Sequence, residues 1–401
     1  MTELHRESKE ADGMDGENRH LVLAVTSETT ARAFLSGLVD TFVADGWRVS
    51  VVTNASESLN SWATTHGAAV HSVPFARSMA LFQDLKVLIK LTAWMRRQTP
   101  AVVVSATPKA GLIATTSARI ARVPVRLYQV WGLRLETVSG WQRRLLHLLE
   151  RTAVSSATHV LANSRSLAAE LVALGIAREG VVKVLGEGSS HGVDTGRFSP
   201  DCEVSLDAET QEFLDKTPGD MTVTYVGRLH PDKGINTLVR AALSCLEQGV
   251  RVRLLMVGRQ DGWDASDLPV EMTDLVYFTG PVPDPRAYIL AADALSLPTR
   301  REGFPNVVLE AAALGVPTVT TRATGAVDSV VDGETGYLVA VDDPDELADR
   351  LVRMSRDRAE LSRMGHAARQ RVLRHFRKEH VEKLQRDFLR QAVAGGCTGK
   401  S

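Results

Sequence analysis

Two acidic and two basic side chains occur in stretches whose composition suits them to bind a charged ligand. Glu302 lies in the segment "TRREGFPN", which glycine and proline interrupt, and Glu310 follows eight positions later within an apolar helical pattern. Upstream, Arg228 and Lys233 flank a turn in "YVGRLHPDKGIN". An ionised carboxylate only accepts hydrogen bonds, so each glutamate suits a pair of sugar hydroxyls, whereas two fixed cations suit a diphosphate.

The surrounding elements place both stretches at the ends of predicted strands. Arg228 follows the apolar run "MTVTYV", and Glu302 follows "ALSLPT". Because glycine and proline prevent a helix from starting before about Asn306, Glu302 lies in the loop and Glu310 about one turn inside the helix. In an unbroken helix residues eight apart are separated by roughly 12 Å along the axis, but the turn can fold Glu302 back over the helix end. Both acids can then face one cleft.

Buried strands alternate with helical segments along the chain, which indicates parallel sheets covered on both faces. The runs "HLVLAVTS", "WRVSVVTNAS" and "PAVVVSAT" belong to a first set, and the pattern restarts after the linker "GEGSSHGVDTGRFSPDCEVSLDAE". We predict an α/β protein with two Rossmann-like domains facing across an interdomain cleft, where ligands bind. The predicted parts are a disordered tail (1–19), an N-terminal domain (20–195), a C-terminal domain (196–375), and a helix crossing back to the first domain plus a tail (376–401).

Composition argues against several classes of protein. The chain has 401 residues, with 47 Lys and Arg against 48 Asp and Glu, so no charge imbalance favours nucleic acid. Its three cysteines, Cys202, Cys245 and Cys397, are widely spaced, which argues against disulfides or a zinc site and favours a reducing cytoplasm. The N-terminus has no apolar signal core, and no run of about eighteen apolar residues occurs, so we expect no membrane span.

Other interpretations of the same residues stay open at this level. Each glutamate taken singly fits a surface or first-turn acid, and Arg228 with Lys233 fits a solvated basic loop. A retaining glycoside hydrolase also uses two carboxylates, about 5 Å apart, but it would leave both cations unused. Cations and acids together describe a nucleotide diphosphate sugar as the ligand.

The combination of "VGRLHPDKG" with "EGFPNVVLEA" resembles glycosyltransferase family 4, and the likeness covers essentially the whole chain. That resemblance implies the GT-B fold and a retaining transferase that uses activated sugars without a metal. The stretches "SATPKAGLIATTSARIARVPVRLYQVWGLRLET" and "VLGEGSSHGVD" are also similar to a subgroup that builds exopolysaccharide, capsule or glycan repeat units on polyprenyl-diphosphate carriers.

The resemblance also implies roles for individual residues. Arg228 and Lys233 would hold the diphosphate, Glu302 would contact the donor sugar, and Glu310 would bind the ribose hydroxyls. The segment "TGPVPDP" around Val282 matches the place where such enzymes contact the base. The complete donor-binding set would be Gly227, Arg228, Lys233, Val282, Glu302, Gly303, Phe304, Pro305, Asn306, Val307 and Glu310.

The first domain is expected to supply the acceptor side. Lys109 in "TPKAG" follows a predicted strand and can meet the acceptor's phosphate or the departing diphosphate as a further catalytic residue, although a solvated loop lysine fits as well. Where the subgroup usually has Asn, this chain has His191, which is either tolerated variation or a weak proton acceptor. We expect no cofactor and no metal, because Asp343 in the acidic stretch "VDDPDELAD" is better explained as a helix cap before Pro344.

These observations predict a hexosyltransferase that uses a nucleotide-sugar donor, with UDP as the expected carrier, and a polyprenyl-diphosphate-linked saccharide as acceptor. The alternatives are a GT-B transferase on a soluble acceptor, a nucleotide-sugar epimerase, and a non-catalytic nucleotide-sugar-binding partner of a glycan assembly complex.

A basic helical stripe suggests contact with the cytoplasmic membrane surface. Lys86, Lys90 and Arg97 fall on one stripe of "SMALFQDLKVLIKLTAWMRRQTP", and a second stripe occurs at Arg144, His147 and Arg151. Basic amphipathic helices can lie on an anionic surface beside a lipid-linked acceptor, whereas helices packed on the domain fit equally. We therefore expect a cytoplasmic protein that is peripheral on the inner face of the plasma membrane.

Overall fold

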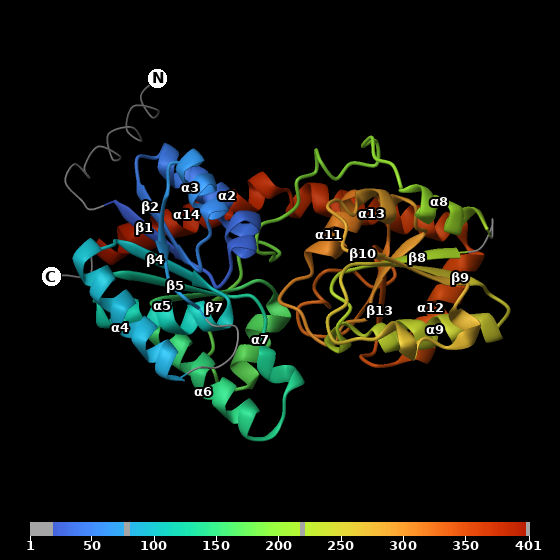
Figure 1. The fold of residues 1–401 in the computed structure, drawn as a ribbon, viewed down its shortest axis with the longest axis horizontal. Helices are drawn as coiled ribbons and strands as arrows, with labels where there is room; N and C mark the ends of the chain where they lie inside the picture. The colour runs from blue at the N-terminus through green and yellow to red at the C-terminus, as the bar shows by residue number, and fades with distance from the viewer. Residues whose placement is uncertain (1–18, 76–80, 217–220, 398–401) are drawn as a thin grey trace. The chain divides into compact units, whose positions relative to one another are not determined.

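The computed structural model describes residues 19–75, 81–216 and 221–397 (Figure 1). Its strands form one seven-stranded sheet in the order β3-β2-β1-β4-β5-β6-β7 and one six-stranded sheet in the order β10-β9-β8-β11-β12-β13. The prediction of an α/β protein with two Rossmann-like domains is confirmed. Residues 1–18 of the predicted tail lie outside the described residues.

The first sheet and its helices come from the N-terminal half of the chain. Its strands are β1 (His20–Ala24), β2 (Arg48–Thr53), β3 (Ala69–Ser72), β4 (Val102–Ala106), β5 (Val125–Val130), β6 (His159–Ala162) and β7 (Val182–Lys183). The helices between them are α2 (Glu28–Ala44), α3 (Glu57–Thr65), α4 (Leu81–Gln98), α5 (Pro108–Ile120), α6 (Gly140–Ser156) and α7 (Arg165–Ala173), and a short 3₁₀ turn, η2, covers Arg134–Thr137.

The second sheet repeats the pattern. Its strands are β8 (Met221–Val226), β9 (Val252–Val257), β10 (Val276–Gly280), β11 (Ala294–Leu297), β12 (Thr318–Thr321) and β13 (Gly336–Val339). The helices are α8 (Ala208–Asp215), α9 (Ile235–Glu247), α10 (Arg286–Leu290), α11 (Asn306–Ala313), α12 (Pro344–Arg356), α13 (Arg358–His375) and α14 (Lys378–Cys397), and the 3₁₀ turns are η3 (Pro231–Lys233), η4 (Ala265–Asp267) and η5 (Val270–Met272).

Apolar strands buried on both faces explain the layered architecture. Every residue of β1, β4, β9, β11, β12 and β13 is buried. In the second sheet α9 packs with α12 and α11 packs with α13, and Figure 1 shows these two pairs on opposite faces. Helix α12 begins at a side-chain cap: the Asp343 carboxylate accepts a hydrogen bond from the Glu346 amide at 2.9 Å, as predicted.

The strand order reverses once in each sheet, between β1 and β4 in the first and between β8 and β11 in the second. In open parallel sheets the loops on either side of such a reversal diverge and leave room for a ligand at the carboxyl ends of the strands. The fold therefore points to the loops after β8 and β11 as a binding position in the second sheet.

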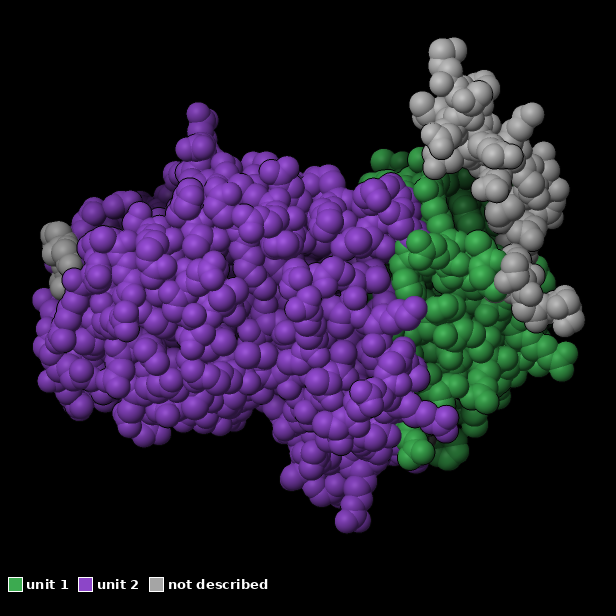
Figure 2. All heavy atoms as spheres, turned by 180° about the vertical axis from the view of Figure 1, so that it is seen from behind, with its two compact units in different colours: residues 1–129, 150–160, 388–401 green, residues 130–149, 161–387 purple. Residues whose placement is uncertain are grey.

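The chain divides into two compact units (Figure 2), one of residues 1–129, 150–160 and 388–401 and one of residues 130–149 and 161–387. The segment after β5, including η2, thus belongs to the unit that contains the second sheet. Helix α14 runs from one unit into the other: Gln385 donates a hydrogen bond to the Ser190 carbonyl, whereas Arg390 forms an ion pair with Asp45. The domain boundaries given above stay a prediction. No helix among the described residues is long and apolar enough to span a membrane.

Candidate functional site

The candidate site is built on the loops that follow β8 and β11, which are neighbouring strands. Gly227 directly follows β8 with φ +156°, and Gly258 directly follows the adjacent β9 with φ +143°. A side chain at Gly258 would collide with the Gly227 carbonyl, so the close backbone contact between these two segments requires glycine at position 258. Arg228 follows directly after this backbone contact.

Arg228 presents its guanidinium at this edge. Its side chain is 52% exposed and forms an ion pair with Asp261, which follows β9. The Tyr225 hydroxyl donates a hydrogen bond to the Arg228 carbonyl at 2.7 Å and fixes the backbone there. Burial and the Glu302 charge raise the pKa of Tyr225 well above its usual value, so Tyr225 remains a donor at physiological pH.

Lys233 ends the short turn η3, and its side chain forms an ion pair with Glu302. The His230 ring accepts a hydrogen bond from the Asp232 amide at 3.1 Å and caps this turn. Gly234 then adopts φ +71°, where a side chain would collide with the Pro298 carbonyl, and α9 begins. The turn thereby aims Lys233 at the loop of Glu302.

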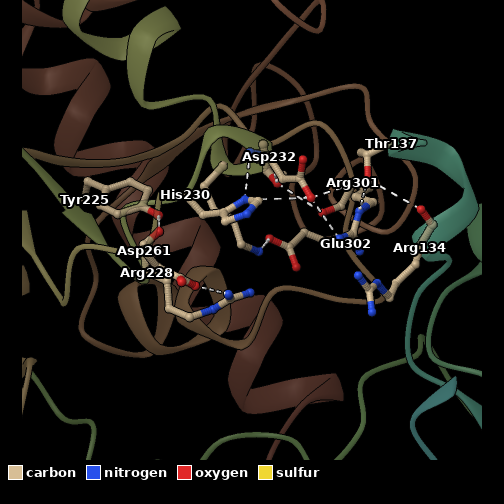
Figure 3. Close-up of polar contacts among 11 residues, drawn as sticks. Arg134, Thr137, Tyr225, Arg228, His230, Asp232, Asp261, Arg301 and Glu302 are labelled. Carbon is tan, nitrogen blue, oxygen red and sulfur yellow. Dashed lines mark hydrogen bonds and ion pairs between the residues drawn. The ribbon is translucent and has the colours of Figure 1, made fainter. Parts of the chain in front are cut away.

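A second ion pair lies beside the first. Arg301 donates from Nη2 to Asp232 Oδ2 at 2.9 Å and from Nε to the Thr137 hydroxyl at 3.0 Å. The Glu302 amide donates to the Thr324 carbonyl at 2.8 Å. The loops after β8 and β11 are therefore joined by ion pairs at two successive positions, and Figure 3 shows Asp232, Arg301 and Thr137 together.

The segment from Gly303 to Val307 leads into α11. Phe304 is 5% exposed, and its ring packs against Phe376 with a centroid distance of 5.4 Å. Pro305 precedes α11 without a side-chain cap, so the first amides of α11 have no side-chain acceptor. The Asn306 side-chain oxygen is buried without a hydrogen-bond partner among the described residues. The Val308 amide donates to the Pro305 carbonyl at 3.2 Å. Helix N-terminal amides favour anions, and the phosphate contact expected at this segment stays a prediction.

Glu310 lies in α11 and is partly buried. Burial raises the pKa of Glu310 to about 7, while the Arg197 charge lowers it and the Asp284 charge raises it. Arg286 and Arg197 both pair with Asp284, and the Arg286 hydrogen bond holds the pKa of Asp284 at about 2. Val282 is also partly buried and packs against a small apolar cluster. The expected ribose and base positions therefore combine a titratable acid with apolar surface.

Lys109 belongs to the other compact unit, so its role on the acceptor side stays a prediction. It is the second residue of α5 rather than a loop residue, and it forms an ion pair with Asp84 of α4 at 2.8 Å. His191 is partly buried beside Ser190, whose hydroxyl lies 2.8 Å from the ring. Burial and then the Lys378 charge lower the pKa of His191 to about 4, so the ring is neutral at physiological pH.

Sequence reasoning missed four members of this constellation: Asp232, Asp261, Arg301 and Thr137. Asp232 and Arg301 each adjoin a predicted residue, so their position in the sequence was a usable signal. Nothing near Thr137 indicated that it would contact a residue 164 positions away. Among the described residues no group of three or more His, Cys, Asp or Glu side chains can hold a metal.

Comparisons with known proteins define the class. The profile described as "Glycosyl transferases group 1" matches residues 220–357, and "Glycosyl transferase 4-like domain" matches residues 29–186. The solved structure of Anabaena Alr3699/HepE with UDP and glucose has a TM-score of 0.70 at 20% identity, covering 93% of this chain and 99% of that one. Sucrose-phosphate synthase from Thermosynechococcus elongatus has a TM-score of 0.72 at 20% identity, covering 94% and 100%. The fold is that of a GT-B glycosyltransferase.

Curated relatives agree with this class. The capsular polysaccharide biosynthesis glycosyltransferase CapM of Staphylococcus aureus is 37% identical over 330 residues, which are 80% of this chain and 86% of CapM. A D-inositol 3-phosphate glycosyltransferase of Nocardia farcinica is 32% identical over 228 residues, 54% of this chain and 49% of that protein. The chain therefore belongs to the group 1 glycosyltransferases.

Proposed function

We propose that this glycosyltransferase moves a hexosyl group from a UDP-sugar to a hydroxyl of a polyprenyl-diphosphate-linked saccharide and retains the anomeric configuration. The observation that carries the donor half of the proposal is the meeting of Arg228, Lys233 and Glu302 at the strand-order reversal of the second sheet. Cations suit the diphosphate and the carboxylate suits the sugar hydroxyls. The UDP and UDP-glucose complexes of HepE support UDP as the carrier.

Donor binding would exchange internal ion pairs for ligand contacts. Arg228 would turn from Asp261 to a phosphate, and Lys233 and Glu302 would release each other to reach the diphosphate and the sugar. Both pairs are at least partly accessible to water, so opening them costs little compared with a charge-assisted contact to phosphate. These ion pairs balance the charges of the site, and Arg228 and Lys233 would become able to hold a dianion when they turn from Asp261 and Glu302 to the phosphates.

The transfer step breaks the bond between the anomeric carbon and the oxygen of the β-phosphate. Negative charge then grows on that oxygen, where Arg228, Lys233 and the first amides of α11 would stabilise it. The acceptor hydroxyl attacks the anomeric carbon from the side of the leaving group, and its proton passes to the departing phosphate oxygen. Front-face attack of this kind retains the configuration and asks the protein mainly for positioning and charge stabilisation.

The acceptor half rests on two other observations. CapM, named for capsular polysaccharide biosynthesis, is 37% identical and aligns with 80% of this chain, whereas the inositol 3-phosphate glycosyltransferase of Nocardia farcinica aligns with 54%. On α4 three large apolar side chains are exposed in one stripe: Phe82 is 87% exposed, Leu85 54% and Ile89 61%. Lys86 and Lys90 are exposed next to them. An exposed apolar stripe flanked by lysines suits an anionic lipid surface, which supports a peripheral location on the inner face of the plasma membrane.

The test offers purified protein a panel of radiolabelled UDP-hexoses with a synthetic polyprenyl-diphosphate N-acetylglucosamine in detergent. We expect label to enter the organic phase for one donor, the product to keep the donor's anomeric configuration by NMR, and Glu302→Gln to abolish transfer. Label that enters only water-soluble glycans, offered in a parallel reaction, would overturn the lipid-linked acceptor. Sugar interconversion without any acceptor would identify an epimerase, and tight UDP binding without turnover would identify a non-catalytic partner.

A further inference from the structure

The two ion pairs that join the loops after β8 and β11 occupy successive positions and have opposite polarity. Asp232 pairs with Arg301 (Figure 3), and the next residues, Lys233 and Glu302, pair with each other. Under the proposed function only the second pair faces the donor. The first pair therefore needs its own explanation.

Asp232 is held more firmly than a surface ion pair. Its backbone carbonyl accepts hydrogen bonds from the Arg300 amide at 2.9 Å and from the Thr299 hydroxyl at 3.2 Å, in addition to the contact between its side chain and Arg301. The side chains of Asp232 and Arg301 are only 21% and 23% exposed. Partial burial alone would raise the pKa of Asp232, but the hydrogen bond and charge of Arg301 hold it below its usual value.

A third element is attached to the same pair. The Thr137 hydroxyl accepts from Arg301 Nε at 3.0 Å and lies 3.4 Å from Asp232 Oδ2. The backbone just before η2 packs directly on the loop of Glu302. The contact is so close that a side chain at Gly303 would collide with the Trp131 carbonyl. The pair thus joins three segments that are far apart in the sequence.

We propose that Asp232, Arg301 and Thr137 form a positioning clamp for Lys233 and Glu302. This inference rests on the proposed function, in which donor binding opens the Lys233–Glu302 pair. Opening that pair removes one of the two side-chain ion pairs between the loops at the moment when both side chains must hold their places around the donor. The pair of Asp232 and Arg301 stays closed, because its opposite charges balance each other and neither side chain contacts the donor. A displacement of about 1 Å in a catalytic group can cost on the order of 10²-fold in rate, so such a link matters for turnover.

The first arm of the test compares Arg301→Gln with Arg300→Gln. Arg300 is the matched control because it is adjacent in the same loop and pairs with Asp342 at 2.8 Å instead of with the β8 loop. We expect Arg301→Gln to lower kcat by about 10- to 100-fold with a much smaller change in the donor KM. Arg301→Lys should restore part of kcat. The kcat of Arg300→Gln should stay within about threefold of the wild-type value. Equal kcat values for Arg301→Gln and Arg300→Gln would overturn the clamp.

The second arm needs no turnover and uses UDP alone with amide hydrogen exchange. In wild-type protein the peptide 299–304 should stay protected when UDP is added, whereas in Arg301→Gln it should exchange about tenfold faster with UDP than without. The same protection in Arg301→Gln as in Arg300→Gln would overturn the clamp whether or not transfer is observed. Absence of transfer by wild-type protein, with the exchange result as expected, would instead contradict only the proposed reaction. If Arg301→Gln unfolds, Arg301→Lys takes its place in both arms and is compared with Arg300→Gln in the same way.

Discussion

Replacing Glu310 by glutamine should stabilise the protein at alkaline pH. Burial raises the pKa of Glu310 from its ordinary value of 4.5 to about 7, so between these values the folded protein binds more protons than the unfolded chain. Stability from this group therefore falls as pH rises through that window. Ionising Glu310 in the folded state costs about 3 kcal/mol at 1.36 kcal/mol for each pH unit. Glu310→Gln removes that cost, so we expect a gain of up to about 3 kcal/mol at pH 8 and almost none at pH 4.5.

The same substitution should weaken nucleotide binding. An ionised carboxylate can accept from both ribose hydroxyls, whereas the amide offers one acceptor and one donor. Losing a charge-assisted hydrogen bond costs about 1.5–3 kcal/mol, so the Kd for UDP at pH 8 should rise on the order of 10- to 100-fold. Because wild-type Glu310 must release its proton before it can bind in this way, the wild-type affinity should also fall as pH drops below about 7.

Denaturant unfolding and calorimetry with UDP, each at pH 4.5 and pH 8, measure both effects. Glu150 provides the control: burial raises the pKa of Glu150 to about 7, and its carboxylate accepts from the Tyr128 hydroxyl at 2.8 Å in the other compact unit. Glu150→Gln should change stability in the same direction and leave the UDP affinity unchanged. An unchanged UDP affinity in Glu310→Gln, or a stability gain equal at both pH values, would refute the reasoning.

Four further predictions concern the cations, the metal and the membrane. Arg228→Ala should lower kcat by about two to three orders of magnitude, or about 3 to 4 kcal/mol, and a kcat within threefold of wild type would remove its role. Asp261→Asn frees Arg228 and should tighten UDP binding by up to about fivefold, whereas weaker binding would show that Asp261 orients Arg228. Transfer should be complete in excess EDTA; a loss restored by Mn²⁺ or Mg²⁺ would contradict metal independence. Co-sedimentation with anionic liposomes at low salt should disappear in Lys86→Glu with Lys90→Glu, and failure of wild-type protein to bind would exclude the membrane contact.

Much of the fold could be predicted because parallel strands buried on both faces appear as short apolar runs between helical segments. Glycine and proline also marked the loops of Arg228 and Glu302 correctly. The pairing of Lys233 with Glu302 could not be predicted in the same way, since it depends on β11 lying beside β8. That neighbourhood is a property of strand order, which local sequence patterns do not contain.

Burial was the other quantity that local patterns did not provide. Lys109 looked like a loop residue, yet Pro108 starts α5 one residue earlier and Asp84 of α4 pairs with it. The apolar residues of α4 could not be sorted from the sequence: Leu91 is buried in the core, whereas Leu85 is 54% exposed. Both outcomes depend on which helix face meets the sheet, and that is decided by tertiary packing.

Calorimetry of UDP, GDP and ADP in EDTA, with wild-type protein and Arg228→Ala, tests the central claim most directly. Arg240→Ala is the control, because Arg240 is an exposed arginine on α9 in the same compact unit. We predict that UDP binds the wild type more tightly than GDP or ADP. Arg228→Ala should weaken UDP binding by about tenfold or more, and Arg240→Ala should leave it unchanged. Binding of none of the three nucleotides, or equal binding by wild type and Arg228→Ala, would contradict a donor site at the ends of β8 and β11.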